Sequence, residues 1–209
     1  MTPETAALPA LTAGVDEAGR GPWAGPVVAA AVILTPDSEA LLRAAGVDDS
    51  KALTRARRER CFDLIHDQAA RGGLWFAIEA ADVGEIDTHN ILQASLRAMS
   101  RAVAGLPLRA EHALVDGNRR PDLDCPCDAI VGGDGKVLSI SAASILAKVA
   151  RDRLMADLAA RHPGYGWERN AGYGTAEHRR ALESLGVTEH HRRSFAPIRA
   201  LLESDTISS

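Results

Sequence analysis

The residues best suited to chemistry lie close together near the N-terminus, in the stretch AGVDEAGRGPWAGP. Two adjacent carboxylates, Asp16 and Glu17, stand shortly before the tripeptide Gly19, Arg20 and Gly21. Carboxylate oxygens suit hard cations such as Mg²⁺ or Mn²⁺, and arginine donates hydrogen bonds in a fork that matches phosphate. Glycines let the backbone approach a ligand closely. The stretch therefore predicts a site that holds a divalent cation and a phosphodiester together.

Three other interpretations fit the same stretch. Gly14 and Gly19 have the spacing of a phosphate-binding P-loop, but Arg20 and Gly21 stand where Lys and Ser or Thr are needed. Gly19, Gly21 and Ala24 form a loose dinucleotide-binding fingerprint, which should open a helix. The run VVAAAVIL that follows is typical of a buried strand instead. The third interpretation is a plain hairpin turn with solvated acids.

The composition is that of an ordinary globular protein. The chain has 209 residues, enough for one domain with a sizeable core, and is 46% hydrophobic and 25% charged. Its net charge of −4 does not favour nucleic-acid binding, so any basic surface must be local. The arginines at 55–60 and the pair Arg192 and Arg193 are the candidates.

The chain lacks the signatures of membrane insertion and export. No run approaches the ~18 apolar residues of a membrane span, and the N-terminus has no basic region of the signal-peptide kind. Three cysteines are too few for a disulfide scaffold. Cys125 and Cys127 fit reduced thiols in a surface loop better than a metal-binding pair. We expect a cytoplasmic monomer.

Hydrophobic patterning predicts a mixed α/β domain. Strands are expected at 11–15, 27–34, 74–80, 112–115 and 129–131, and helices at 38–45, 54–71, 86–104, 139–160, 175–186 and 197–203. We expect one domain over 11–203, which ends in a short helical segment, with a flexible tail at 1–10 and a polar tail at 204–209. The strands begin as a hairpin and then alternate with helices, so we expect a mixed central sheet with helices on both faces.

Two further acids stand at predicted strand ends, where α/β sheets bind ligands. Asp116 ends the strand at 112–115, and Asp134 follows two glycines. Phosphodiester hydrolysis needs a nucleophile made from water and a stabilised leaving 3′-oxyanion, and two divalent cations about 4 Å apart supply both. Asp16, Glu17, Asp116 and Asp134 could hold such a pair. Neighbours on a strand point to opposite faces, so Asp16 and Glu17 share a site only if the backbone bends or one acts through water.

Other polar residues are candidates for contacts with a nucleic-acid backbone. Ser141, Ser144, Lys148 and Asp152 fall on one face of the helix at 139–160. They could receive a nucleic-acid backbone, but Lys148 and Asp152 are equally well spaced to pair with each other. Lys51 either contacts a phosphate or belongs to a tripeptide that caps the next helix.

The segment GVDEAGRGPWAGPVVAAAVIL resembles the N-terminal signature of bacterial ribonuclease HII. Five later segments agree in order with that family, and they are Asp49–Lys51, Val115–Gly117, Ser141–Asp152, Gly172–Thr175 and Glu189–Phe195. The resemblance implies a ribonuclease H-like fold with two divalent ions, Mn²⁺ or Mg²⁺, at the four acids. It also implies an endonuclease that cuts the RNA strand of RNA–DNA hybrids and cuts 5′ of single ribonucleotides in duplex DNA.

The resemblance extends to substrate contacts. Since only the 2′-hydroxyl distinguishes RNA from DNA at a given nucleotide, it implies that Gly19, Arg20 and Gly21 contact this hydroxyl and the adjoining phosphates. It places the ring of Tyr173 on the neighbouring deoxyribose, and it favours phosphate contact for Lys51. Two alternatives remain: another metal-dependent nuclease or polynucleotidyl transferase of the same fold, and a binding module without catalysis. A binder gains nothing from a cluster of negative charge facing phosphates.

Overall fold

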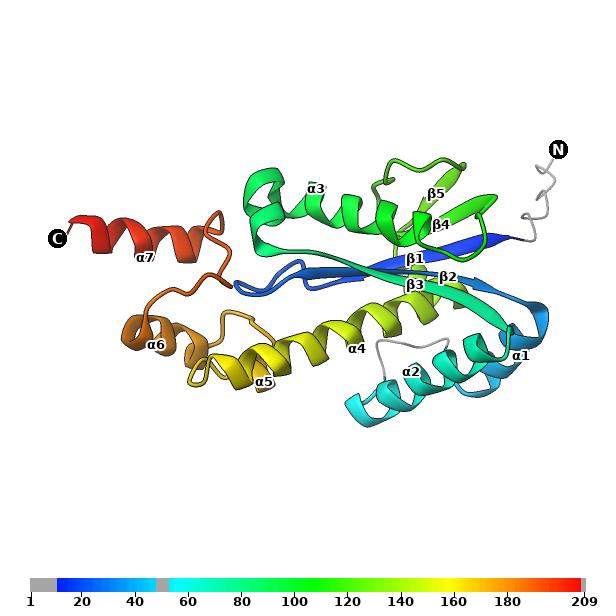
Figure 1. Ribbon diagram of the computed structural model, residues 1–209, viewed down its shortest axis with the longest axis horizontal. Helices are drawn as coiled ribbons and strands as arrows, with labels where there is room; N and C mark the ends of the chain where they lie inside the picture. The colour runs from blue at the N-terminus through cyan, green and yellow to red at the C-terminus, as the bar shows by residue number, and fades with distance from the viewer. Residues whose placement is uncertain (1–10, 48–52, 208–209) are drawn as a thin grey trace.

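The computed structural model describes residues 11–47 and 53–207 and contains a five-stranded mixed sheet (Figure 1). Its strand order is β3-β2-β1-β4-β5. The strands are β1 (Thr12–Ala18), β2 (Val27–Leu34), β3 (Leu74–Ala81), β4 (His112–Asp116) and β5 (Cys127–Ile130). The first three are antiparallel neighbours, whereas β4 and β5 run parallel to β1. The predicted mixed α/β sheet is confirmed.

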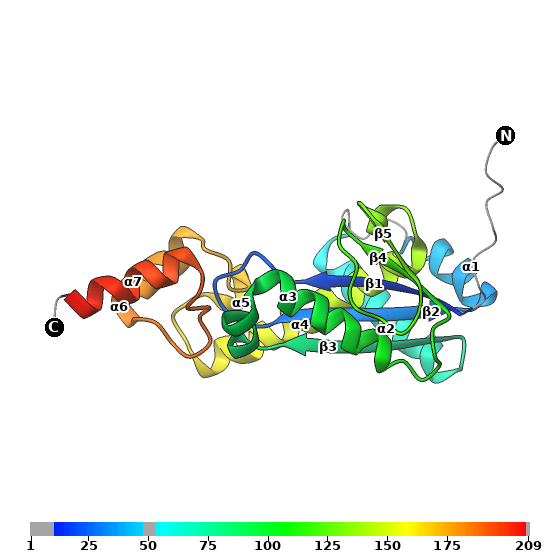
Figure 2. The same ribbon diagram turned by 90° about the horizontal axis from the view of Figure 1, so that it is seen from above.

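The helices lie on both faces of this sheet and beyond one end of it. They are α1 (Pro36–Ala44), α2 (Arg55–Ala70), α3 (Val83–Ala104), α4 (Leu138–Arg161), α5 (Trp167–Asn170), α6 (Ala176–Leu185) and α7 (Ala196–Ile207), with a 3-10 turn, η2, at Gly133–Gly135. In Figures 1 and 2, α3 covers one face, α4 and α2 cover the other, and α6 and α7 extend from one end.

Several boundaries differ from the expected ones. Strand β1 continues through both acids to Ala18, and β5 begins at Cys127, so this thiol lies at a strand end and not in a loop. The short helix α5 lies in a stretch expected to be loop, and α7 reaches Ile207, inside the stretch expected as a polar tail. The expected tail at 1–10 and the tripeptide that contains Lys51 lie outside the described residues.

Two apolar layers hold the helices against the sheet. Ala29 and Ala31 of β2 join the layer under α3, while Ala30 joins the layer under α4. These side chains are fully buried, and their small size lets both helices approach the sheet closely. Helix α4 contributes its predicted apolar stripe, Ala142, Ile145, Leu146 and Val149, each at most 2% exposed.

Gly14 sets how closely α4 approaches β1. A Cβ atom on Gly14 would lie 2.2 Å from the carbonyl carbon of Ser139 and 2.4 Å from the amide nitrogen of Ile140. Because both neighbours are backbone atoms, no side-chain movement could make room for it. Glycine at this position therefore lets the first turn of α4 lie directly on β1, next to the residues that follow Gly14.

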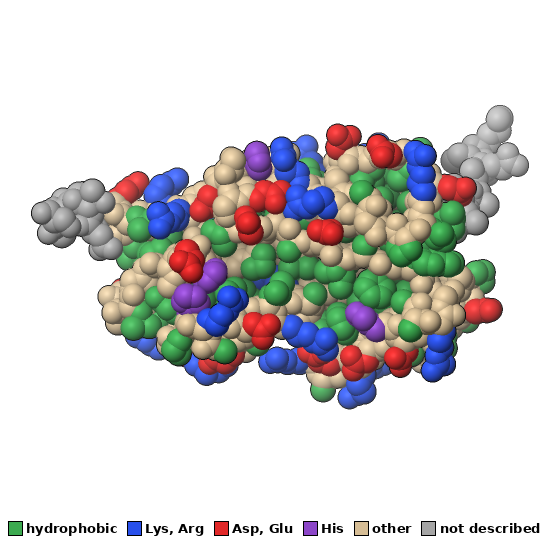
Figure 3. Space-filling model, in the orientation of Figure 1, with side chains coloured by type: hydrophobic (Ala, Val, Ile, Leu, Met, Phe, Trp, Pro, Cys, Tyr) green, Lys and Arg blue, Asp and Glu red, His purple; other side chains and the backbone are tan. Residues whose placement is uncertain are grey.

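Among the helices that the structure describes, none has the length and apolar character needed to cross a membrane. On the face shown in Figure 3, hydrophobic side chains form a band between the charged surfaces of α3 and α2.

Candidate active site

The four predicted acids border one open cleft of about 450 Å³ at the carboxyl ends of β1 and β4. We call it the carboxylate cleft. Its lining residues are Asp16, Glu17, Ala18, Gly19, Arg58, Asp116, Asp134, Ser144, Ile145, Lys148, Arg151 and Tyr173. Residues far apart in the sequence thus meet where the parallel strands end, as expected for an α/β sheet.

Adjacent Asp16 and Glu17 border this cleft together without a break in their strand. The β1–β2 ladder continues through both residues, but the β1–β4 ladder ends at the pair Val15 and Val115. Beyond that pair the edge of β1 is open toward the cleft, and both carboxylates reach it. The amide of Glu17 donates a 2.7 Å hydrogen bond to Oδ1 of Asp16. The two residues therefore reach one cleft from a continuous strand.

The remaining two acids are linked by a glycine turn. The amides of Gly133 and Asp134 donate to Oδ1 of Asp116, at 2.6 and 3.4 Å. A Cβ on Gly133 would lie 2.7 Å from Cδ1 of Ile140, so this close approach favours glycine. Asp134 is 3% exposed, and its carbonyl accepts a hydrogen bond from the Ser141 hydroxyl. The turn η2 thereby brings Asp134 next to Asp116.

The electrostatics of the cleft favour a cation. Burial, and then the charge of Glu17, raise the pKa of Asp16 well above its ordinary value, although a hydrogen bond from Ser144 opposes the shift. Burial also raises the pKa of Glu17, against the lowering effect of Arg20. Oε2 of Glu17 is buried without a hydrogen-bond partner among the described residues. Four oxygen-donor side chains with an unsatisfied buried carboxylate oxygen fit Mg²⁺ or Mn²⁺, whose charge would reverse the repulsion.

Comparisons with known proteins agree with this geometry. A family model described as Ribonuclease HII matches residues 13–198. The chain belongs to the ribonuclease HII family. It is therefore a ribonuclease H, a hydrolase of the RNA strand in RNA–DNA hybrids that depends on divalent metal ions.

Individual relatives support this membership over most of the chain. A ribonuclease HII of Ruegeria pomeroyi is 57% identical over 191 residues, 91% of this chain and 78% of the relative. One of an Acidovorax species is 58% identical over 196 residues, 94% of this chain and 90% of the relative. The crystal structure of ribonuclease H2 from Pyrococcus horikoshii superposes with a TM-score of 0.80 at 28% identity, covering 92% and 97% of the two chains. A structure titled Bst-RNase HIII in complex with Mn²⁺ shares the fold, with a TM-score of 0.74 at 20% identity over 92% and 69%.

Arg192 corrects one expectation for this ribonuclease HII family member. Its guanidinium is fully buried and donates to the carbonyls of Gly19 (2.6 Å), Arg20 (2.8 Å), Gly25 (2.9 Å) and Pro26 (3.2 Å). Burial lowers its pKa to about 9. A side chain with these partners cannot reach a phosphate, so Arg192 holds the loop at 19–26, between β1 and β2, from inside. The sequence interpretation as a phosphate contact was wrong.

Arg151 does the same from α4, and the sequence analysis missed it. It donates from Nε to the carbonyl of Pro26 at 2.9 Å, from Nη1 to Ala171 at 3.0 Å and from Nη2 to Ala24 at 3.2 Å. A Cβ on Gly19 would lie 1.9 Å from Nε of Arg151, and Gly19 has φ +98°. We call Arg151 and Arg192 the arginine clamp. The spacing of Arg151 in the sequence could have indicated its burial, because it follows the buried Ala143 and Ala147 at four-residue intervals on the same face of α4.

Tyr173 borders the cleft, and its stacking on a sugar stays a prediction. Its side chain borders the carboxylate cleft and is 47% exposed, and its Cε1 lies 3.4 Å from a Cβ built on Gly21. Nδ1 of buried His178 lies 3.0 Å from the carbonyl of Tyr173, while Nε2 of His178 accepts from Trp167 at 3.1 Å. This pattern requires the Nδ1–H tautomer of His178, which then anchors the backbone of Tyr173.

Other predicted contacts divide between the cleft and the interior. Lys148 borders the cleft but also pairs with Asp152 at 2.6 Å, so the ion pair weighed for these residues is present. Ser141 is 1% exposed and donates to backbone carbonyls of Asp134 and Val137, which rules it out as a surface contact. Arg193 is exposed, and its amide donates to Asp87 at 3.0 Å. Lys51 lies outside the described residues.

Proposed function

We propose that this ribonuclease H also cuts 5′ of single ribonucleotides embedded in duplex DNA, leaving 3′-hydroxyl and 5′-phosphate ends, and so acts in ribonucleotide removal. The observation that carries the proposal is the position of Tyr173. Its half-exposed ring borders the same cleft as the four acids and lies beside Gly21. A nuclease that cut RNA without regard to the next sugar would need no aromatic surface there.

Asp16, Glu17, Asp116 and Asp134 are the residues that would hold two divalent cations, Mn²⁺ or Mg²⁺. When bound, the cations supply an activated water and stabilise the leaving 3′-oxyanion. Asp116 is oriented for this role by the amides of Gly133 and Asp134, and Asp16 by the amide of Glu17. The unpartnered Oε2 of Glu17 supports a cation in this position.

We assign selectivity for RNA to the loop at 19–26, which we call the substrate loop, and within it to Gly19, Arg20 and Gly21. Arg192 binds the carbonyls of Gly19 and Arg20, which restricts how the loop can move. The loop amides are then directed to the 2′-hydroxyl and the adjoining phosphates. The Arg20 side chain is 51% exposed and joins them, although one of its nitrogens also pairs with Glu17 at 3.2 Å. Tyr173 stacks on the sugar that follows. Lys148 and Arg193 add phosphate contacts, and we keep Lys51 as a further candidate.

Three free cysteines support a reducing compartment, and we propose that the enzyme works in the cytoplasm as a monomer. The competing function is that of another nuclease or polynucleotidyl transferase of the same fold. The arginine clamp and Tyr173 favour the first proposal, because the clamp holds the loop beside the four acids and Tyr173 lies next to Gly21 of that loop.

The test is a cleavage assay on three labelled duplexes: one with a single ribonucleotide, one with an RNA–DNA hybrid, and one of DNA alone. With Mn²⁺ or Mg²⁺ we expect a single cut 5′ of the ribonucleotide, multiple cuts in the hybrid, and none in the DNA duplex. Asp116→Asn is the negative control. Cleavage of the hybrid with no cut at the single ribonucleotide would disprove the proposal while leaving the ribonuclease H activity intact.

A further inference from the structure

A second group of metal-ligating side chains lies at the C-terminal end of α4, and it shares no residue with the carboxylate cleft. One ligand atom each from His162, Glu189 and His190 lies within 4.8 Å of the others. The two imidazole rings meet edge to face, with centroids 4.7 Å apart, and Nε2 of His190 lies 3.6 Å from Oε1 of Glu189. Figure 3 shows histidine side chains beside an acidic one on this face.

The chemistry of these donors differs from that of the four acids. Two imidazole nitrogens and one carboxylate oxygen are ligands that suit Zn²⁺, whereas Mg²⁺ prefers oxygen alone. We propose that His162, Glu189 and His190 bind one Zn²⁺ ion, with a fourth position left for water. Three protein ligands with an open position is a common zinc arrangement, and the three ligand atoms here already lie within 4.8 Å of one another.

The surroundings hold the two imidazole rings close together. Both histidines are partly buried, and their rings meet edge to face at the end of α4. Trp167 packs beside both rings, with centroids 5.9 Å from His162 and 6.3 Å from His190, and limits their rotation. The charge of Arg161 opposes a cation here, and the carboxylate of Glu189 offsets it.

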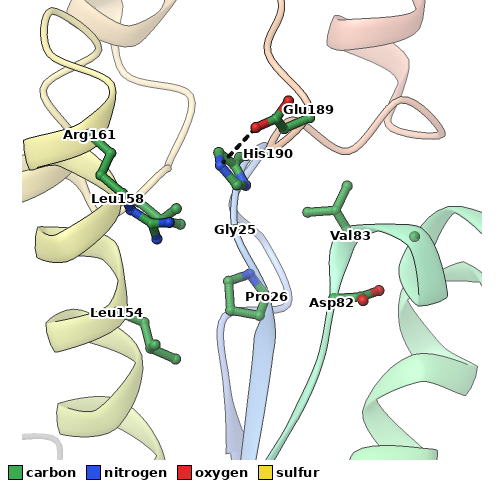
Figure 4. A pocket seen from close by; sticks show the side chains of 10 residues that line it. Gly25, Pro26, Asp82, Val83, Leu154, Leu158, Arg161, Glu189 and His190 are labelled. Carbon is green, nitrogen blue, oxygen red and sulfur yellow. Dashed lines mark ion pairs between the residues drawn. The ribbon is translucent and has the colours of Figure 1, made fainter.

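An entry path for the ion is present. A cavity of about 400 Å³ opens beside His190 and Glu189, between α4, the start of α3 and the substrate loop. Figure 4 shows these two side chains at one end of the cavity, with Leu158 and Arg161 on one side and Val83 on the other. Water and a hydrated ion can therefore reach Glu189 and His190 without unfolding, and the ligand atom of His162 lies within 4.8 Å of theirs.

A bound ion would connect α4 to the substrate loop. The amide of Gly25 donates to the carbonyl of His190 at 2.8 Å, and the amide of Arg192 donates to the carbonyl of Trp23 at 2.8 Å. Because His162 is the residue that ends α4, zinc would fix this helix end to the segment that carries Arg192. We expect zinc to raise the melting temperature of the whole domain by binding the folded state.

The test is a calorimetric titration of the full chain with ZnCl₂ in excess MgCl₂, which occupies the carboxylate cleft. We expect one Zn²⁺ per chain. His162→Gln and Glu189→Gln should each weaken zinc binding by about tenfold or more, because loss of a ligand costs at least as much as loss of its outer-shell support. The matched control is Glu183→Gln on α6, because Glu183 is an exposed acid as Glu189 is. This variant should bind zinc as the unmodified chain does.

Two further variants separate this site from others that could take zinc. Asp116→Asn should keep the zinc affinity although it removes a catalytic ligand, and the double variant Cys125→Ser, Cys127→Ser should keep it as well. Zinc should raise the melting temperature of both, but not that of His162→Gln. The proposal fails if no zinc binds in excess Mg²⁺, if His162→Gln binds zinc as tightly as the unmodified chain, or if the cysteine variant loses the ion.

Discussion

The carboxylate cleft and the arginine clamp are two buried groups of like charge, yet their surroundings differ. In the clamp, each guanidinium donates at least three hydrogen bonds, all of them to backbone carbonyls. In the cleft, the pKa of Asp16 is raised by burial and by Glu17, and Oε2 of Glu17 is unpartnered among the described residues. A buried charge with completed hydrogen bonds stabilises structure, whereas one left incomplete awaits a ligand.

The largest difference should appear when one acid is neutralised. Asp16→Asn and Asp116→Asn should each lower turnover on the order of a thousandfold, because loss of a metal ligand removes several kcal/mol of transition-state stabilisation. Stability should be unchanged or higher, since repulsion between carboxylates is relieved. Single-turnover cleavage and thermal unfolding without metal measure the two effects. Near-normal turnover by either purified variant would remove that residue from the metal site.

Neutralising the clamp should lower stability, whereas neutralising an acid should leave stability unchanged or raise it. Arg192→Ala leaves the carbonyls of Gly19, Arg20 and Gly25 without this donor, while the carbonyl of Pro26 keeps its hydrogen bond from Arg151. We therefore expect a loss of about 3 kcal/mol or more in the free energy of unfolding. Urea denaturation measures it. An Arg192→Ala chain as stable as the unmodified one would show that the clamp is dispensable, and the contrast between the two regions would be wrong.

Mg²⁺ should stabilise the fold through the cleft and not through the clamp. Free Mg²⁺ at about 100 times its Kd should raise the unfolding free energy by about 2.7 kcal/mol, and Asp16→Asn should lose most of this gain. Since the pKa of Asp16 is raised in the fold, the native state keeps a proton that the unfolded chain releases. Without metal, stability should therefore fall as pH rises from about 4 toward that raised pKa. Melting temperatures measured across pH, with and without Mg²⁺, check both predictions. In the unmodified chain, a melting temperature that Mg²⁺ does not raise would contradict the first, and one that does not change with pH in the absence of metal would contradict the second.

Tyr173 lies between the two regions, in the cleft and on a segment that Arg151 holds through Ala171. Tyr173→Ala should lose on the order of 1–3 kcal/mol of stacking on a single embedded ribonucleotide, and less on a continuous hybrid. Tyr173→Phe should keep much of the activity, because the ring stacks. Rates on both substrates at saturating metal test this. Equal losses on the two substrates would mean that Tyr173 only supports the loop.

The smallest effect should come from the residue next to the clamp. Arg193→Ala should leave stability nearly unchanged and reduce the log–log salt slope of substrate binding by about one. Arg192→Ala is the matched comparison, since the two arginines are adjacent and only one is buried. Lower turnover by Arg193→Ala at saturating substrate, with unchanged binding, would refute the assignment of Arg193 to affinity.

The sequence by itself determined the mixed α/β sheet, the apolar stripe of α4 and the four acids. Strand and helix periodicity is a local property of the sequence, and glycines next to carboxylates can be recognised in it directly. The stripe residues Ala142, Ile145 and Leu146 are buried as their spacing predicts. That Asp16 and Glu17 share a cleft was not predictable, since it depends on where the β1–β4 ladder ends.

Only the tertiary structure decided the roles of the charged residues outside that cluster. Arg192 and Arg193 are neighbours in an irregular segment, where no periodicity indicates which side chain turns inward. Arg192 is buried because the carbonyls of the substrate loop, more than 160 positions earlier in the chain, converge on its guanidinium. A side chain's burial depends on partners brought from distant segments, and those partners exist only once the chain has folded.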